Sequence, residues 1–263
     1  MAMRGLSWAD RRRAIVLLIL AAIGLSLLFF TYHTAFYRAP SCTDGIQNQG
    51  EAGIDCGGPC QYLCSTHVQP PTAQFVRPLA NGGNRTDIIA YIDNPNPAAA
   101  AAGATYSVQL YGTDGALLAQ KSGTVDLPPH STVPVFMPNF YNGAGQAANA
   151  FITFDQASLK WFLSTTSPQT LPVSNIQVAA STSTPNVTAT ITNPTALPFY
   201  NVRVVVVVLG ASSSSNNVIA ASQTVVPSIP AQGTAPLTFT WSVPFAGTPV
   251  REEIFPIVPL AHP

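Results

Sequence analysis

Charged residues are scarce in this chain, and the two signs balance. Only 8% of its 263 residues are Asp, Glu, Lys or Arg, with 11 basic residues against 11 acidic ones. A protein that neutralises nucleic-acid phosphates needs a basic excess, so nucleic acid is excluded as an expected partner. Apolar residues make up 47% of the chain, so the low charge does not indicate disorder. The length allows more than one hydrophobic core.

Residues that form catalytic constellations are also few. The chain has four histidines in unrelated contexts: His33, His67, His130 and His262. It contains no GxSxG, no HExxH and no glycine-rich phosphate loop. Glu252 and Glu253 are adjacent, and adjacent residues on a strand face opposite ways, which makes them poor partners for acid–base chemistry. We therefore expect a protein that is not an enzyme, and an unrecognised extracytoplasmic enzyme is the remote alternative.

A long apolar run stands at the N-terminus. Residues 14–30 carry no charge and, with Thr31 and Tyr32, are long enough to span a thin hydrocarbon core. Arginines precede the run, which predicts a cytoplasmic N-terminus (1–13) and a transmembrane signal anchor (14–32). A cleaved signal peptide is the alternative, but no small-x-small cleavage site follows. We expect a single-pass protein of the cytoplasmic membrane whose C-terminal bulk lies in the periplasm or at the cell surface.

The cysteines all fall within residues 41–64, just beyond this anchor. They are Cys42, Cys56, Cys60 and Cys64. Disulfides are the default in an exported segment, so we predict that all four are disulfide-bonded, in one of three possible pairings. A zinc site made of four thiolates and a thioredoxin-like redox centre are the alternatives. The compartment and the absence of CxxC pairs disfavour both.

Oxygen-bearing side chains lie between the first two cysteines. They are Asp44, Asn48, Glu51 and Asp55. No Lys or Arg occurs between Arg38 and Arg77, so repulsion among the three carboxylates is not offset by a nearby base. Calcium prefers oxygen ligands and tolerates irregular loops, so we predict these four residues as calcium ligands. The spacing is not that of an EF-hand.

The remainder of the chain reads as short strands separated by turns, in two copies. Alternating or β-branched runs such as residues 87–92 and 106–112 end in turn signals, and Asp114-Gly115 is a hairpin signal. Residues 88–95 match residues 187–194, and each copy ends in Asn-Pro. This pattern predicts an all-β fold with two tandem immunoglobulin-like β-sandwiches at 74–164 and 171–263. Ala98–Ala102 is expected to form a helical turn or a loop, and Ser65–Gln74 a short extended linker.

A run of valines in the second copy has an unusual outer face. Alignment with residues 106–112 directs Val204, Val206 and Val208 into the sandwich core, which leaves Val205 and Val207 facing outward. Exposed apolar strands invite aggregation, so we predict that Val205 and Val207 are covered, either by the other sandwich or by a partner protein. A harmless central strand shielded by neighbouring side chains is the alternative.

Two resemblances follow from these motifs. The sandwich repeats resemble FxLYD/LEA14-type immunoglobulin-like domains through Ile92-Asp93-Asn94-Pro95, Val108-Gln109-Leu110-Tyr111 and Pro128–Thr132, and through their second-copy counterparts Ile191–Pro194, Val206–Leu209 and Pro230–Thr234. The repeats depart from that family where Gly112 and Gly210 follow the strand. Residues 42–64 resemble an extracellular element of the form C-x-D-G-I-x-N-x-x-E-x-x-x-D-C-G-G-x-C, which implies a disulfide-bonded surface module.

These observations predict a membrane-anchored extracytoplasmic binding or structural protein: a scaffold, adhesion or envelope-assembly component. Its expected partners are the membrane and other envelope or surface proteins. The alternative is an accessory subunit of a membrane, secretion or pilus complex, in which the anchor and the valine face would pack on partner subunits. Calcium is the one cofactor that the residues suggest.

Overall fold

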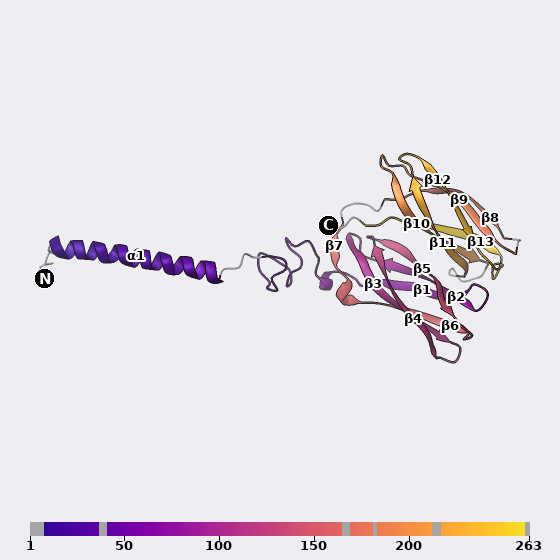
Figure 1. Cartoon of the computed structure of the whole chain (residues 1–263), viewed down its shortest axis with the longest axis horizontal. Helices are drawn as coiled ribbons and strands as arrows, with labels where there is room; N and C mark the ends of the chain where they lie inside the picture. Colours follow the sequence, from indigo (N-terminus) through magenta and orange to yellow (C-terminus); the bar gives the residue numbers. More distant parts are fainter. Residues whose placement is uncertain (1–7, 37–40, 165–168, 181–182, 212–216, 261–263) are drawn as a thin grey trace.

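In a computed structural model, the chain forms an N-terminal helix, a disulfide-bonded module and two β-sandwiches (Figure 1). The structure describes residues 8–36, 41–164, 169–180, 183–211 and 217–260. The predicted all-β fold with an N-terminal apolar helix and a disulfide module is confirmed.

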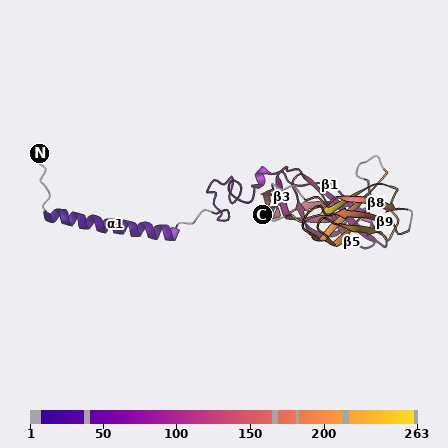
Figure 2. The same ribbon diagram turned by 90° about the horizontal axis from the view of Figure 1, so that it is seen from above.

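Helix α1 runs from Trp8 to Phe36 and projects away from the sandwiches in both views (Figures 1 and 2). The most apolar window within its segment Arg11–Phe36 has a mean hydropathy of 2.8, and none of that window is buried. This helix is long and apolar enough to cross a membrane. It extends past the predicted 14–32 at both ends, and near its C-terminal end the hydroxyls of Thr31 and Thr34 donate hydrogen bonds to backbone carbonyls one turn earlier.

The first sandwich is built from two antiparallel sheets with strand orders β1-β2-β5 and β4-β3-β6, and β7 also pairs with β3. The strands are β1 (Thr72–Ala80), β2 (Arg85–Asn94), β3 (Ala99–Gly112), β4 (Leu117–Leu127), β5 (Ser131–Asn142), β6 (Ala147–Phe154) and β7 (Trp161–Leu163). The Asp114-Gly115 turn joins β3 to β4, as its sequence predicts. Alternate residues of β2 and β3 form its core, with Ile88, Ile92, Val108 and Leu110 fully buried.

The second sandwich repeats this topology, with strand orders β8-β9-β12 and β11-β10-β13. The strands are β8 (Val173–Ala179), β9 (Asn186–Thr192), β10 (Phe199–Gly210), β11 (Val218–Ile229), β12 (Thr234–Thr240) and β13 (Pro249–Ile257). Strand by strand, β8 to β13 correspond to β1 to β6, so the predicted duplication is a duplication of topology. Its core contains the inward valines Val204, Val206 and Val208 together with residues of β9 and β12.

Two local predictions were wrong. The alanines predicted as a helical turn or a loop instead begin β3, where Ala99 to Ala101 pair with β7 and are almost fully buried. Their small side chains fit the closely packed end of the sandwich, and this packing overrides the helix propensity of alanine. The expected linker is also ordered: Ser65–His67 form a 3₁₀ turn, and β1 has already begun at Thr72.

The two sandwiches lie side by side, so the molecule has four sheet layers (Figure 1). The β1-β2-β5 sheet of the first sandwich faces the β11-β10-β13 sheet of the second, and strands β2 and β10 are consequently buried on both faces. The chain then returns to the first sandwich, where the Leu260 backbone N–H donates to the Asp126 carboxylate at 3.0 Å.

Candidate functional site

The Cys-rich segment forms a small module held by two disulfides, Cys42–Cys60 and Cys56–Cys64. All four predicted cysteines are therefore disulfide-bonded. The stretches enclosed by the two disulfides overlap in sequence, so the bridges hold the whole segment compact. Gly58, the second glycine of the Cys-Gly-Gly sequence, has to be a glycine. A Cβ at this position would lie 2.2 Å from the Gly50 carbonyl oxygen, and the residue adopts a φ of +59°.

The polar residues of the module bind one another's backbone. The Asp55 carboxylate accepts from the Gly45 N–H at 3.0 and 3.1 Å, and the Glu51 carboxylate accepts from the Asp55 N–H at 3.2 Å. The Asn48 amide donates to Asp44 at 2.8 Å, and this bond together with the Ile46 N–H lowers the pKa of the Asp44 carboxyl. The spacing of these residues in the motif thus serves the internal bonding of the loop.

The four predicted calcium ligands are brought into one module but not into one tight cluster. Among the described residues, the group of potential ligand atoms within 4.8 Å of one another is Cys42, Glu51 and Cys60. Both sulfurs belong to one disulfide, so Glu51 alone offers a free ligand atom there. Its Oε1 lies 3.0 Å from Cys60 Sγ, a contact rather than a hydrogen bond because this sulfur carries no proton. Calcium binding stays a prediction.

The module is docked onto the first sandwich. The Leu63 N–H donates to the Trp161 carbonyl at 2.7 Å, and Tyr62 forms a β-bridge with Phe162 of β7. Further along, both the N–H and the carbonyl of Gln69 are bonded to the side-chain amide of Asn96, at 2.8 Å each. These backbone bonds fix the direction in which the module leaves the sandwich.

The first asparagine of the Asn-Pro turn in each sandwich, Asn94 or Asn193, has the same set of contacts in both copies. Asn94 and Asn193 are fully buried. The Asn94 amide donates to three carbonyls, the nearest at 2.7 Å on Pro128, and the Asn193 amide donates to three equivalent carbonyls, including Pro230 at 2.9 Å. Each asparagine therefore ties the turn after its own strand to the turn between the fourth and fifth strands of its sandwich.

The outward valines of β10 lie in the contact between the sandwiches. Val205 is 2% exposed and Val207 is fully buried, in a cluster with Ile89 and Tyr91 of β2. Phe75, Phe136 and Phe255 pack around the edge of this cluster. The other sandwich therefore covers the valine face, so that these residues do not form a free surface.

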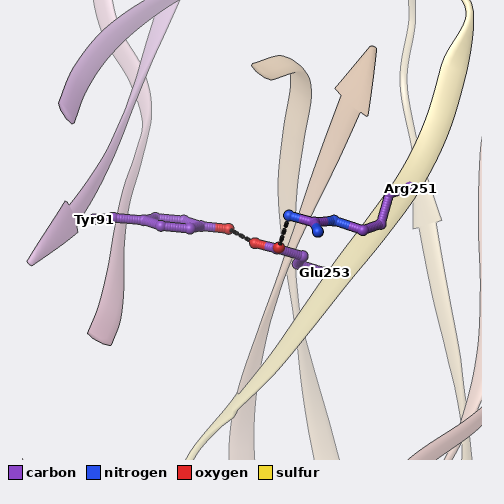
Figure 3. Close-up of polar contacts among 3 residues, drawn as sticks. All are labelled: Tyr91, Arg251 and Glu253. Atoms are coloured by element: carbon purple, nitrogen blue, oxygen red, sulfur yellow. Dashed lines mark hydrogen bonds and ion pairs between the residues drawn. The ribbon is translucent and has the colours of Figure 1, made fainter. Parts of the chain in front are cut away.

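A polar latch lies at the side of this cluster (Figure 3). The Tyr91 hydroxyl donates to Glu253 Oε2 at 2.6 Å, and Arg251 binds the other Glu253 oxygen at 2.5 Å. Burial raises the pKa of the Tyr91 hydroxyl well above its ordinary value, and the Glu253 carboxylate adds to the shift. No local sequence signal pairs Tyr91 with Glu253, because the two residues are 162 positions apart.

A second set of contacts lies farther along the interface. The Arg85 guanidinium donates to the Ser242 hydroxyl at 3.0 Å, and a Cβ on Gly82 would lie 2.5 Å from a methyl group of Val243. Burial raises the pKa of the Asp87 carboxyl, which accepts from the Asn139 N–H and the Asn81 amide. This end of the interface is therefore polar and closely packed.

The two outer faces of the pair differ from the inner ones in chemistry. Ser107 and Gln109 of β3 occupy the positions that Val205 and Val207 hold in the second copy, and both are partly exposed. Thr188 and Thr190 of β9 likewise occupy the positions of Ile89 and Tyr91. Apolar residues therefore stand on the two facing sheets, and polar residues stand at the same positions on the two sheets that face solvent.

The remaining candidates for chemistry lie on several different elements, and no histidine belongs to a group of three possible metal ligands among the described residues. Of the predicted histidines, His33 is on α1, His67 in the turn after the module and His130 in the turn before β5, while His262 lies outside the described residues. Glu252 and Glu253 share β13, but it is Glu253 that reaches the latch.

Comparison with known proteins adds little to this geometry. No protein-family model matches the chain, and no curated protein matches it. Among solved structures, the chain is similar to the crystal structure of red sea bream transglutaminase, at 14% sequence identity and a TM-score of 0.23. The match covers 72% of this chain but 29% of that one, so the chain spans less than a third of that enzyme's length. A superposition this poor carries no argument about activity.

Proposed function

We propose that the protein is a membrane-anchored extracytoplasmic scaffold or binding protein that presents its two sandwiches to other envelope or surface proteins as one rigid body. The observation that carries the proposal is the apolar cluster between the sandwiches, in which Val205 and Val207 are buried against Ile89 and Tyr91. Domains that share such a cluster keep a fixed relative orientation, whereas domains joined only by a linker move independently.

The docked module supports the same function. It lies between α1 and the first sandwich, and its bonds from Leu63 to Trp161 and from Gln69 to Asn96 replace a free tether. In the proposal, α1 is a single-pass anchor with a cytoplasmic N-terminus, and the disulfides are formed in the oxidising space outside. The module then acts as a rigid spacer on the side of the sandwiches that is nearest to the anchor. Its function is non-catalytic.

The alternative function is that of an accessory subunit in a membrane, secretion or pilus complex. Such a subunit would have to bind its partners through a surface other than the one formed by Val205 and Val207. Val205 and Val207 pack on the other sandwich, so a partner subunit would have to use another face. The exposed Tyr200 and Val225 mark positions on the second sandwich at which contact with a partner can be tested.

The test is a topology and crosslinking experiment on the full-length protein in its producing cell. External protease should digest a C-terminal epitope in cells with a permeable outer layer, and an N-terminal epitope should survive. Photoreactive residues placed at Tyr200 and at Leu117, which is half exposed on β4, should crosslink to a defined envelope protein. A protected C-terminus would contradict the proposed topology, and no crosslinked protein from any exposed position would contradict the scaffold function.

A further inference from the structure

Strand β6 has one unpaired edge. It pairs with β3 along Tyr106–Gly112, and no other strand pairs with it in the part of the chain that the structure describes. In an antiparallel strand, alternate residues direct both N–H and C=O away from the paired neighbour. The outer edge of β6, which lies beside β1 of the facing sheet, therefore carries a row of backbone donors and acceptors that no strand pairs with among the described residues, and such a row is a template for another strand.

This edge also lacks the protection found on the other outer strands. Proteins guard exposed edges with charges, prolines or irregular backbone. The other outer strands carry such features: Arg77 and Pro78 on β1, Lys121 on β4, Pro134 and Pro138 on β5, a register shift between Ser174 and Gln177 on β8, Pro227 on β11, Pro236 on β12, and Arg251 and Pro256 on β13. From Asn149 to Phe154, β6 has no charge, no proline and no register shift.

A groove runs beside this edge, where the two sheets of the first sandwich meet. Its cavity volume is about 480 Å³, and its lining comes from Phe75–Pro78 of β1 and Ala147–Phe151 of β6. The lining includes five consecutive residues of β6, which is about 17 Å of extended chain, so a short strand can pair along this stretch. Most of the lining residues are apolar by type, polar and apolar atoms contribute about equally to the lining surface, and Phe151 is 57% exposed.

One charge lies in this lining. Arg77 is exposed, and among the residues that the structure describes it has no ion-pair partner. A carboxylate on a bound strand would meet this guanidinium in the form of a charge-assisted hydrogen bond. The groove thus combines a backbone template, apolar side-chain contacts and one fixed positive charge.

We propose that β6 and this groove accept an extended strand from a partner protein, which extends the β4-β3-β6 sheet, buries apolar side chains in the groove and places a carboxylate opposite Arg77. This is strand addition, in which main-chain hydrogen bonds supply affinity and side-chain pockets supply selectivity. The inference rests on the proposed display function, because it names the chemistry of the segment that the displayed sandwich binds.

A second copy of the chain is a poorer occupant of the edge. Two β6 strands would pair antiparallel about a two-fold axis perpendicular to the strands. The module docks at one end of the first sandwich, on Trp161 and Phe162, so this pairing would place the two membrane anchors at opposite ends of the joined sheet. Two chains anchored in the same membrane could not both satisfy that arrangement.

The test uses the full-length protein in lipid nanodiscs and two fluorescent octapeptides of alternating Val and Thr, one with a central Asp and its twin with a central Lys. In an anisotropy titration, the Asp peptide should bind saturably. The Lys peptide should bind about fivefold more weakly, the effect expected of one exposed ion pair. Hydrogen exchange should show slower exchange in β6 when the Asp peptide is bound.

Variants separate the groove from non-specific binding. Phe151→Lys places a charge on the edge at a side chain already exposed, and should weaken the Asp peptide at least tenfold. Arg77→Gln should remove the difference between the two peptides. Leu117→Lys is the control: it adds the same charge to the half-exposed start of β4 and should change neither peptide.

Three results would overturn the proposal: no saturable binding of either peptide at millimolar concentration, unchanged binding in Phe151→Lys, or self-association through β6 detected as an Asn149-to-Asn149 crosslink. Circular dichroism of each variant checks that it is folded. These outcomes do not depend on the topology experiment, so a failed groove and a failed display function can be told apart.

Discussion

Exchanging Val205 and Val207 for Ser and Gln should uncouple the two sandwiches without unfolding either of them. Ser and Gln are the residues that the first sandwich carries at the same positions, Ser107 and Gln109, where they face solvent without harm to its own core. The exchange therefore leaves the valines of the second core in place. The loss should be confined to the contact with Ile89 and Tyr91.

The size of the effect follows from burial. Val205 is 2% exposed and Val207 is fully buried. Burying one such side chain contributes about 1.5–3 kcal/mol, so losing both should weaken the contact by about 3–6 kcal/mol. An unpaired glutamine amide in the apolar cluster would add to the loss.

Two measurements check this prediction. Distances between probes on Leu117 and Val225, both half exposed, should be narrowly distributed in the wild type and broad in the variant. Urea unfolding should separate into two transitions, because the sandwiches no longer unfold as one unit. The control is Thr188→Ser with Thr190→Gln on the outer face of β9, which should change stability by less than about 0.5 kcal/mol. A narrow distance distribution and an unchanged single transition in the valine variant would refute the reasoning.

Other predictions concern the asparagines, the latch, the disulfides and the calcium ligands. Asn94→Ala and Asn193→Ala should each lower the free energy of unfolding by about 1–3 kcal/mol, because three carbonyls lose the buried amide that donates to them, and a loss below about 0.5 kcal/mol in urea unfolding would contradict this. The Tyr91 hydroxyl has a raised pKa in the folded protein, so it holds its proton more tightly there than in the unfolded chain. Its contribution to stability is complete below pH 10.0, the ordinary pKa of a tyrosine, and is lost as the pH rises above that value. Tyr91→Phe should remove this part of the alkaline loss of stability, and identical pH profiles for the two proteins would count against the latch. Reducing Cys42–Cys60 and Cys56–Cys64 should each cost about 2–3 kcal/mol of local stability, so hydrogen exchange should speed up in residues 41–64 and stay slow in β2 and β3. If Asp44, Asn48, Glu51 and Asp55 bind calcium, calorimetric titration of the oxidised protein should release heat that Asp44→Asn reduces, and no heat at millimolar calcium would remove the prediction.

The strands and their duplication were readable because their signals are local. Alternation of apolar residues and turn dipeptides such as Asp114-Gly115 depend on neighbours in sequence, and the repeat supplied each strand with a second example. The inward and outward faces of β10 could be assigned only by aligning it with residues 106–112, because five consecutive valines show no alternation of their own. The repeat therefore carried information that neither copy holds alone.

What the sequence could not show depends on contacts between distant segments. The sequence around Ile89 and Tyr91 is that of an ordinary strand. It contains no signal from which their contact with Val207 could be predicted. The latch joins Tyr91 to Glu253, which lies 162 positions later in the chain. The disulfide pairing is equally non-local, since three pairings satisfy the same spacing. Asn-Pro was visible as a repeated motif, but its role appeared only once Asn94 was seen to bind carbonyls more than 30 positions away.

The contact between the sandwiches joins non-equivalent faces of two like units, which makes it heterologous. A heterologous contact can in principle repeat without limit, because each added unit exposes another copy of the surface to which it bound. When such a contact repeats between molecules and does not close into a ring, it produces open fibres. Here the series stops at two. Ser107 and Gln109 stand where the next unit would need Val205 and Val207, and Thr188 and Thr190 stand where it would need Ile89 and Tyr91. The two sandwiches thus have the geometry of subunits in a polymer, and four polar side chains on their outer sheets oppose the addition of another unit.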